Sequence, residues 1–257
     1  MMQTSVSEPG ISFNFVPTPW DDDLLGGTTG FIKINNYDTE SDQSKRIFNE
    51  WIHDNEVVYC GLKVDPENLI LKKWATILGF YFVNSTCEVF KRNLQNLPNT
   101  GSKIFIRHAN ESDYEKILSN NLNNMIHGRF HEDYNFQNLV EKRQKIILKN
   151  QFESDEVFFS IGELENNFVG YSIFKKNKNA IELLHMGVDG DVLLPTQAIR
   201  YWEAVFKYMR DNLNAKRISG RLTLTNTAAV SIYSNLQFMF HRPLDEFALI
   251  KSIANER

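Results

Sequence analysis

Hydrophobic and polar positions recur along most of the chain with the spacing of strands or helices. In the first hundred residues, apolar or alternating runs predict strands at 31–37, 57–64 and 81–91. Apolar positions at helical spacing predict helices at 40–53 and 67–78. Because strands and helices alternate, this part of the chain is predicted to have an α/β structure.

The rest of the chain contains a longer series of elements. Ser112 and Glu115 have the spacing of a capping box and predict the start of a helix after a strand at 103–107. A second helix is predicted at 135–149, followed by a three-stranded meander at 157–164, 168–174 and 180–188 with turns at 165–167 and 176–179. The last predicted elements are an amphipathic helix at 196–213, a strand at 218–224, a short helix at 227–235 and two final strands.

A linker separates these two parts. Residues 96–102 gather Asn, Pro, Thr, Gly and Ser between two strand-like runs, and such a composition is typical of a connection. The chain is therefore predicted to divide into residues 1–100 and residues 101–257.

One internal comparison relates the two parts. Asn68 and Asn226 each stand 12 positions before a phenylalanine, and a strand-like run precedes each of them. We interpret the two segments as a degenerate internal repeat. Ala75 stands in the first segment where Tyr233 stands in the second, so only the second carries a phenol at that position.

Composition and charge narrow the class of protein. The net charge of -4 argues against a nucleic-acid-binding surface, because phosphate contacts need clustered Lys and Arg. The first residues do not have the pattern of a secretory signal, and no apolar run approaches the roughly 20 residues that cross a bilayer. Cys60 and Cys87 lie in strand-like runs without CxxC spacing, which predicts buried reduced thiols. We expect a cytoplasmic protein that uses no metal, membrane or nucleic acid.

The segment from Asn226 to Phe238 carries the clearest resemblance to a known family. Asn226, Ala229 and Tyr233 stand where the GNAT superfamily of N-acetyltransferases has an Asn, a small residue and a Tyr. Phe238 matches the Phe of a Gly-Phe pair, and Gln237 departs from its Gly; each residue alone also fits a cap or packing role. With the order of elements over residues 103–251, the chain resembles this superfamily. The resemblance implies a mixed α/β sheet of the GNAT fold, preceded by a smaller, partial GNAT-like half.

The resemblance implies acyl-CoA as co-substrate. Its pyrophosphate would bind backbone N–H groups at the start of the helix predicted from residue 196. The preceding loop, residues 189–195, carries two Asp residues where the superfamily has a basic, glycine-rich loop. The expected cofactor-binding residues are Met186, Gly187, Val188, Leu194, Thr196, Gln197, Ala198, Asn226 and Ala229.

Amine acylation requires a polarised carbonyl, a base for the amine proton and an acid for the leaving thiolate. The resemblance implies that Tyr233 is the acid and that a backbone N–H of residues 184–187 holds the carbonyl, where Gly187 suits a bulge. His185 is the candidate base, although many members of the superfamily use none. Strand alternation predicts that Glu182 and His185 face opposite sides of the sheet.

Residues 125–134 lie where GNAT enzymes build the acceptor pocket. Their Gly-Arg-Phe sequence, with the partial first half, resembles the N-acetyltransferases that act on dTDP-linked fucosamine. The expected roles are a diphosphate contact for Arg129, stacking on thymine or sugar for Phe130 and Tyr134, and orientation of the amine for His131 or Asp133. A solvated loop between helices is the alternative for each residue.

The sequence therefore predicts an N-acyltransferase that moves a short acyl group from CoA to the amine of a dTDP-linked aminodideoxyhexose, in surface polysaccharide synthesis. The acyl group is acetyl or a hydroxyacyl such as 3-hydroxybutanoyl, and the amine is at carbon 3 or carbon 4. The alternatives are a GNAT enzyme acting on a protein or small-molecule amine and a non-catalytic acyl-CoA-binding module. A homodimer is expected because two-fold symmetry is the commonest assembly.

Overall fold

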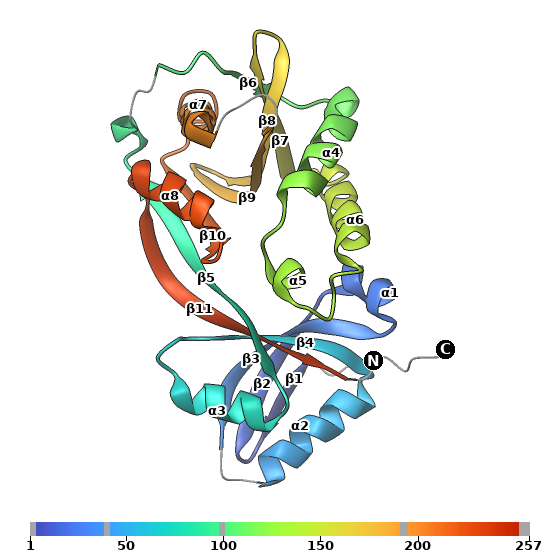
Figure 1. The fold of residues 1–257 in the computed structure, drawn as a ribbon. Coiled ribbons are helices and arrows are strands. Elements are labelled where there is room, and N and C mark those ends of the chain that lie inside the picture. The colour runs from blue at the N-terminus through green and yellow to red at the C-terminus, as the bar shows by residue number, and fades with distance from the viewer. Residues whose placement is uncertain (1–3, 39–41, 98–100, 191–194, 252–257) are drawn as a thin grey trace. The chain divides into compact units, whose positions relative to one another are not determined.

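The chain folds into two compact units (Figure 1). The computed structural model describes residues 4–38, 42–97, 101–190 and 195–251. Unit 1 comprises Met1–Ser85, Glu132–Leu139 and Pro243–Arg257, and unit 2 comprises Thr86–His131 and Val140–Arg242. No single cut near residue 100 separates these units. The division of the chain into domains at that position stays a prediction.

Unit 1 is a sheet covered by two helices. Its elements are β1 (Ser5–Glu8), β2 (Ile11–Pro17), η1 (Pro19–Asp21), α1 (Asp22–Leu25), β3 (Thr28–Tyr37), α2 (Asp42–Asp54), β4 (Val57–Val64), α3 (Leu69–Ile77) and the start of β5 (Tyr81–Arg92). Strands β1, β2 and β3 are antiparallel neighbours, and β3 pairs with β4 in parallel. The sequence patterns missed the β1–β2 hairpin. Its signal was the alternation of Ile11, Phe13 and Phe15, all buried in the core.

Unit 2 has more elements and two separate cores. Its elements are the rest of β5, η2 (Leu94–Asn96), β6 (Phe105–His108), η3 (Glu111–Asp113), α4 (Tyr114–Asn124), α5 (Arg129–Glu132), α6 (Val140–Phe152), β7 (Val157–Leu164), β8 (Asn167–Asn177), β9 (Ala180–Val188), α7 (Pro195–Asp211), β10 (Arg217–Thr223), α8 (Thr227–Asn235) and the start of β11 (Met239–Ile250), whose residues from Pro243 onward belong to unit 1. Its strands lie in the order β5-β10-β9-β8-β7-β6. Within the described ranges, no helix is both long and apolar enough to cross a membrane.

Helices cover both faces of the unit 2 sheet (Figure 1). On one face, here called the α7 face, residues of α7 and α8 such as Phe206 and Tyr233 pack against Ile181 and Leu183 of β9. On the other, the α4 face, residues of α4 and α6 pack against Tyr171 and Ile173 of β8. Burial of each large apolar side chain contributes roughly 1.5–3 kcal/mol to folding. The two faces give the sheet two chemically separate sides.

Strands from each half of the chain complete the sheet of the other. Residues 86–92 of β5 pair antiparallel with β10, which belongs to unit 2. Residues 245–250 of β11 pair antiparallel with β4, which belongs to unit 1. The two final strands predicted from the sequence were wrong, because β11 is a single strand of 12 residues. Both cysteines predicted to be buried thiols, Cys60 and Cys87, are free and buried.

Predicted helix starts differ from the observed ones in two places. The capping box before α4 joins Asn110 and Asp113 rather than Ser112 and Glu115, because the Asn110 side chain accepts from the first turn while Asp113 accepts from the Asn110 backbone N–H. The helix predicted at 135–149 begins at Val140. By contrast, β4, β7, β9 and α8 have the predicted bounds.

The internal repeat is visible in hydrogen bonds. Asn68 caps α3 by accepting from the Leu71 N–H at 3.0 Å, and Asn226 caps α8 by accepting from the Ala229 N–H at 3.0 Å. Phe80 N–H then donates to the Ala75 carbonyl at 3.0 Å, and Phe238 N–H donates to the Tyr233 carbonyl at 2.9 Å. The two segments therefore share one conformation from cap to strand.

The position before each phenylalanine requires a left-handed backbone. Gly79 has a φ of 92° and Gln237 a φ of 57°. A residue with a Cβ is less stable in this conformation by about 1 kcal/mol. This explains why glycine is the expected residue there, and why Gln237 still fits the motif.

Candidate active site

Strands β9 and β10 run in parallel only over their first residues. The paired positions begin with Ala180 and Arg217 and end with Leu183 and Gly220. Beyond that pair, β9 continues alongside β8 and β10 continues alongside β5. The two strands therefore part, and no described strand pairs with the β10-facing backbone groups of β9 beyond Leu183.

A β-bulge accompanies this separation. On β8, Ile173 and Phe174 are consecutive, yet they pair with His185 and Leu183, so Leu184 is the extra residue. The prediction that Glu182 and His185 face opposite sides of the sheet was wrong, because the inserted residue reverses the alternation. Both side chains lie on the α4 face. The sequence predicts the bulge at Gly187, but the structure has it at Leu184.

Tyr233 lies next to the last paired position. A Cβ on Gly220 would be 3.8 Å from the Tyr233 hydroxyl oxygen, so the absence of a side chain there leaves room beside the phenol. The Tyr233 ring packs edge-to-face against Trp202 and Phe238, at centroid distances of 4.9 Å in both cases. Its hydroxyl has no hydrogen-bond partner among the described residues. Burial, and to a smaller extent Cys87, raises the pKa of the phenol, which is therefore protonated at neutral pH.

His185 lies on the other side of the sheet and is held at one nitrogen. Its Nδ1 is 2.5 Å from the Tyr171 hydroxyl and 3.3 Å from the Asn121 amide nitrogen. Burial, followed by the nearby His131, lowers the pKa of His185 to about 4. The imidazole is therefore neutral at neutral pH. Such a low pKa is poorly matched to a general base, which works best with a pKa near the operating pH.

Comparison with known sequences finds no match, whereas comparison with solved structures finds proteins of similar fold. No protein-family profile and no curated protein matches the sequence. A functionally unknown conserved protein from Staphylococcus epidermidis has a TM-score of 0.65 and 12% identity, covering 96% of this chain and 93% of that chain. A GCN5-related N-acetyltransferase from Kribbella flavida has a TM-score of 0.61 and 10% identity, covering 97% and 90%. A tandem GNAT protein from the clavulanic acid biosynthesis pathway has a TM-score of 0.57 and 8% identity, covering 96% and 80%.

The chain has the GNAT fold. Unit 2 supplies the GNAT order of elements, and unit 1 supplies the additional, related half. At these identities the likeness concerns the fold. Chemical roles therefore depend on the residues of this chain.

The predicted cofactor-binding residues of this GNAT fold fall into three groups. Met186 and Val188 point to the α7 face, whereas Gly187 lies under Tyr171, where a Cβ would be 2.5 Å from the Tyr171 ring. Thr196, Gln197 and Ala198 are in the first turn of α7, the helix that follows β9, and Leu194 lies outside the described residues. Asn226 and Ala229 bond to each other as the cap of α8. No arrangement of His, Cys, Asp and Glu able to hold a metal occurs within the described ranges.

The predicted acceptor residues are divided between the units. Arg129, Phe130 and His131 belong to unit 2, and Asp133 and Tyr134 belong to unit 1. Phe130 is buried, so its ring is not exposed for the predicted stacking on a base or sugar. Asp133 is also buried. It accepts hydrogen bonds from the Tyr81 hydroxyl at 2.6 Å and from Asn135 at 3.0 Å. Burial and this bond raise the pKa of Tyr81. Tyr134 is exposed.

Two features of the acceptor region were missed by sequence reasoning. The Arg143 guanidinium lies 3.9 Å from the centre of the Phe130 ring, and Arg129 lies 5.0 Å from the same ring. A cavity of about 340 Å³ lies between α4, α5 and α6. Its lining residues are Leu122, Asn123, Met125, Ile126, His131, Val140, Glu141 and Gln144. No spacing in the sequence links α6 to this loop, so these residues had no signal.

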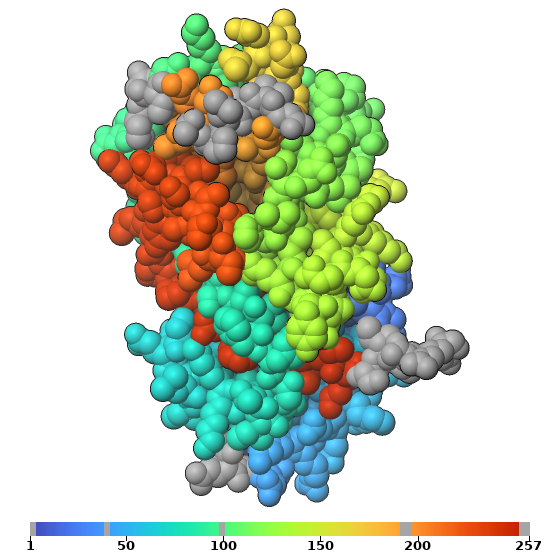
Figure 2. Space-filling view, in the orientation of Figure 1, coloured from blue at the N-terminus to red at the C-terminus, as the bar shows by residue number. Residues whose placement is uncertain are grey.

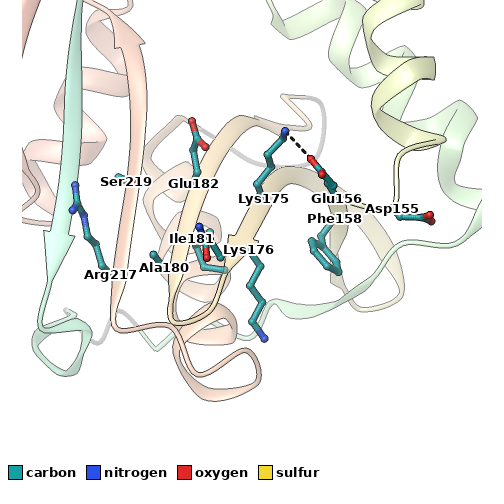
Figure 3. A pocket seen from close by; sticks show the side chains of 11 residues that line it. Asp155, Glu156, Phe158, Lys175, Lys176, Ala180, Ile181, Glu182, Arg217 and Ser219 are labelled. Carbon is teal, nitrogen blue, oxygen red and sulfur yellow. Dashed lines mark hydrogen bonds and ion pairs between the residues drawn. The ribbon is translucent and has the colours of Figure 1, made fainter.

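A larger cavity of about 700 Å³ lies at the opposite ends of β9 and β10 (Figure 3). Lys175, Glu182 and Arg217 line it with mixed charges, and Lys175 forms an ion pair with Glu156 at 3.5 Å. Because it is at the ends of the strands that remain paired, it is separate from the opening near Tyr233. We assign it no role in acyl transfer.

Proposed function

We propose that unit 2 is an N-acyltransferase that moves a short acyl group from coenzyme A to a primary amine. The observation that carries this proposal is the parting of β9 and β10 after Leu183 and Gly220, with the Tyr233 hydroxyl, to which no described residue is hydrogen-bonded, beside Gly220. An extended thioester arm can pair with the open edge of β9 as a strand would. The first turn of α7 follows this edge in the chain and offers backbone N–H groups to the pyrophosphate.

In the proposed reaction, the amine nitrogen attacks the thioester carbonyl carbon, a C–N bond forms, and the C–S bond breaks. Tyr233 donates a hydrogen bond to the departing sulfur. Its raised pKa keeps the phenol protonated, so its main contribution is to stabilise the developing negative charge. The amine releases its proton to solvent, because His185 is a weak base. Holding amine and thioester together supplies much of the rate enhancement.

For the acceptor, we propose a dTDP-linked aminodideoxyhexose used in surface polysaccharide synthesis. Arg129 and Arg143, which flank Phe130, support an anionic acceptor because guanidinium groups bind diphosphates well. The acyl group is acetyl or a hydroxyacyl such as 3-hydroxybutanoyl. A cytoplasmic homodimer remains part of the proposal.

A small free amine is the second candidate. The cavity next to His131 has about 340 Å³ of space, which is near the lower limit for ligand pockets. Glu141 in its lining can attract a cation. This candidate differs from the first in needing no nucleotide.

Thiol release measured across a panel of acyl-CoAs and amines tests both candidates. We expect turnover with at least one acyl-CoA and a dTDP-linked amino sugar, and no turnover with the matching sugar that lacks the amine. Turnover with small amines alone would select the second candidate. Tight CoA binding with no turnover for any pair would contradict the enzyme and leave an acyl-CoA-binding module.

A further inference from the structure

Three side chains from three elements meet on the α4 face of unit 2. Asn121 comes from α4, Tyr171 from β8 and His185 from β9, and Asn121 and Tyr171 are completely buried. The Asn121 amide nitrogen lies 2.6 Å from the Tyr171 hydroxyl, and that hydroxyl lies 2.5 Å from His185 Nδ1. The two rings also stack, with centroids 5.4 Å apart. The contacts hold the imidazole ring in one orientation.

With the Asn121 amide oriented so that its nitrogen faces Tyr171 and His185, the hydrogen bonds determine the tautomer of His185. The Asn121 N–H donates to the Tyr171 oxygen, so the Tyr171 O–H is left to donate to His185 Nδ1. The amide nitrogen of Asn121 also faces Nδ1, at 3.3 Å, and can only donate to it. Nδ1 is therefore an acceptor, and the single proton of the neutral imidazole lies on Nε2.

The other ring nitrogen is open. Nε2 has no hydrogen-bond partner among the described residues, and it is not one of the fully buried polar atoms. Gly187 makes the arrangement possible, because a Cβ there would be 2.5 Å from Tyr171 and 3.0 Å from the Asn120 side-chain oxygen. The ring is therefore pinned at Nδ1 and exposes an N–H at Nε2.

We propose that Asn121 and Tyr171 are positioning residues that keep His185 as a neutral Nε2–H donor, which polarises a substrate oxygen beside the opening between β9 and β10. This inference rests on the proposed function, in which the thioester carbonyl oxygen is the acceptor of that bond. A neutral imidazole N–H can act in this way without gaining or losing a proton. His185 then assists the attack as an electrophile.

The surroundings of His185 agree with a neutral ring. His131 on α5 lowers the pKa of His185 electrostatically, and burial raises the pKa of Tyr171 on β8, which stays protonated. Glu182 lies on the same face of β9, opposite Lys175 of β8 and three residues before His185. Ile117 of α4 and Leu148 of α6 are buried in the same cluster, and Tyr114 of α4, whose pKa is raised by burial, packs against it. These groups leave Asn121 and Tyr171 to determine which nitrogen carries the proton.

Nitrogen NMR of the ligand-free enzyme tests the tautomer. With ¹⁵N-labelled histidine, the signals of His185 are those that disappear in His185→Gln. We expect a pyridine-like Nδ1 and a pyrrole-like Nε2 at neutral pH. The reverse assignment would overturn the proposal, since it would require the Asn121 oxygen to accept from Tyr171 and would leave Nε2 as a base.

Asn121→Asp tests whether the two residues control the ring. A carboxylate at this position can only accept, so Tyr171 donates to it and accepts from Nδ1–H, and the tautomer of His185 reverses. Asn124→Asp adds the same charge three residues further along α4, at an exposed position whose side chain bonds the Asn120 carbonyl, and should leave the tautomer unchanged. Equal effects of the two variants, or no reversal in Asn121→Asp, would show that Asn121 does not set the proton position.

Kinetics connect the tautomer to the reaction. Tyr171→Phe should lower kcat roughly 10-fold with little change in KM for the acyl-CoA. In Asn121→Asp, kcat/KM should gain a rising limb between about pH 5 and pH 8, because Nε2 then titrates as a base. An unchanged kcat in Tyr171→Phe would show that the positioning of His185 by Tyr171 does not contribute to catalysis. Because the NMR result needs no substrate, failure of acyl transfer itself would be recognised separately.

Discussion

Both units contain two parallel strands that part after a few residues, but the residues at the two partings differ. In unit 1 the last paired position of β3 and β4 joins Ile32 and Leu62, and in unit 2 that of β9 and β10 joins Leu183 and Gly220. Leu62 and Gly220 are equivalent, since each stands six positions before the capping asparagine. Unit 1 therefore has a buried leucine where unit 2 has no side chain.

In a second pair of equivalent positions, the larger side chain belongs to unit 2. Ala75 in α3 corresponds to Tyr233 in α8. In unit 1, moreover, the Tyr37 hydroxyl at the end of β3 donates to the side chain of Asn68 at 3.1 Å. The same scaffold thus carries Leu62 and Ala75 in unit 1 where unit 2 carries Gly220 and Tyr233. We expect one acyl-CoA per chain.

Gly220→Leu would make unit 2 resemble unit 1 and should have the largest effect. A Cβ added at this position would lie 3.2 Å from Leu183. A larger side chain would occupy the space beside the Tyr233 hydroxyl. We expect turnover to fall by roughly 100-fold or more, with weaker CoA binding by calorimetry. Gly220→Ala should have a smaller effect. CoA affinity equal to that of the wild type in a folded Gly220→Leu would contradict the assignment of this opening.

Tyr233→Phe removes the hydroxyl that distinguishes α8 from α3. We expect kcat to fall about 100-fold and the dissociation constant of CoA to change little, because the hydroxyl acts on charge that develops during the reaction. Tyr201→Phe is a matched control, since the Tyr201 hydroxyl on α7 is buried without a hydrogen-bond partner among the described residues. Unchanged kcat in Tyr233→Phe would remove Tyr233 from the mechanism.

Leu62→Ala opens the corresponding place in unit 1. Leu62 is almost completely buried, so we expect the free energy of unfolding to fall by about 2–5 kcal/mol, measured by urea titration. Turnover by the remaining folded enzyme should not change. A loss of kcat with full stability would show that unit 1 takes part in the reaction, contrary to the comparison of the two units.

Gln237→Gly gives α8 the residue that ends α3 in unit 1. The left-handed backbone at Gln237 costs about 1 kcal/mol for a residue with a Cβ, so the substitution should stabilise the protein by up to that amount. Thermal unfolding measures the change. The reciprocal Gly79→Gln should destabilise the protein by a similar amount. If both substitutions changed the stability in the same direction, the left-handed backbone would not explain the effect.

The sequence predicts much of this fold because local patterns determine it. The bounds of β4, β7, β9 and α8 follow from apolar periodicity and turn residues, and the two asparagine caps follow from the internal repeat. The comparison of the two segments also singles out Tyr233, whose role stays a prediction. The β-bulge at Leu184 has no signal in the sequence, because the side chains before and after this residue alternate between the two faces as in a regular strand. It was therefore impossible to assign His185 to the correct face.

Non-local features account for the rest of the difference. Asn121, Tyr171 and His185 come from three elements, and no spacing between them indicates that their side chains meet. The exchange of β5 and β11 was also hidden, since pairing partners of strands are chosen by packing. Gly187 gave a partial signal. The sequence predicts a bulge at Gly187, whereas the lack of a side chain at this residue makes room for Tyr171.

The exchanged strands also impose an order on folding during synthesis. Strand β5 is made before β10, so the two strands can pair as soon as β10 leaves the ribosome. Strand β4 must wait for β11, which follows every other described strand in the chain. Until then β4 presents an unpaired edge that can bind other unfolded chains. A pause before residue 239 would therefore be a risk for unit 1, although unit 1 is the first part to be translated.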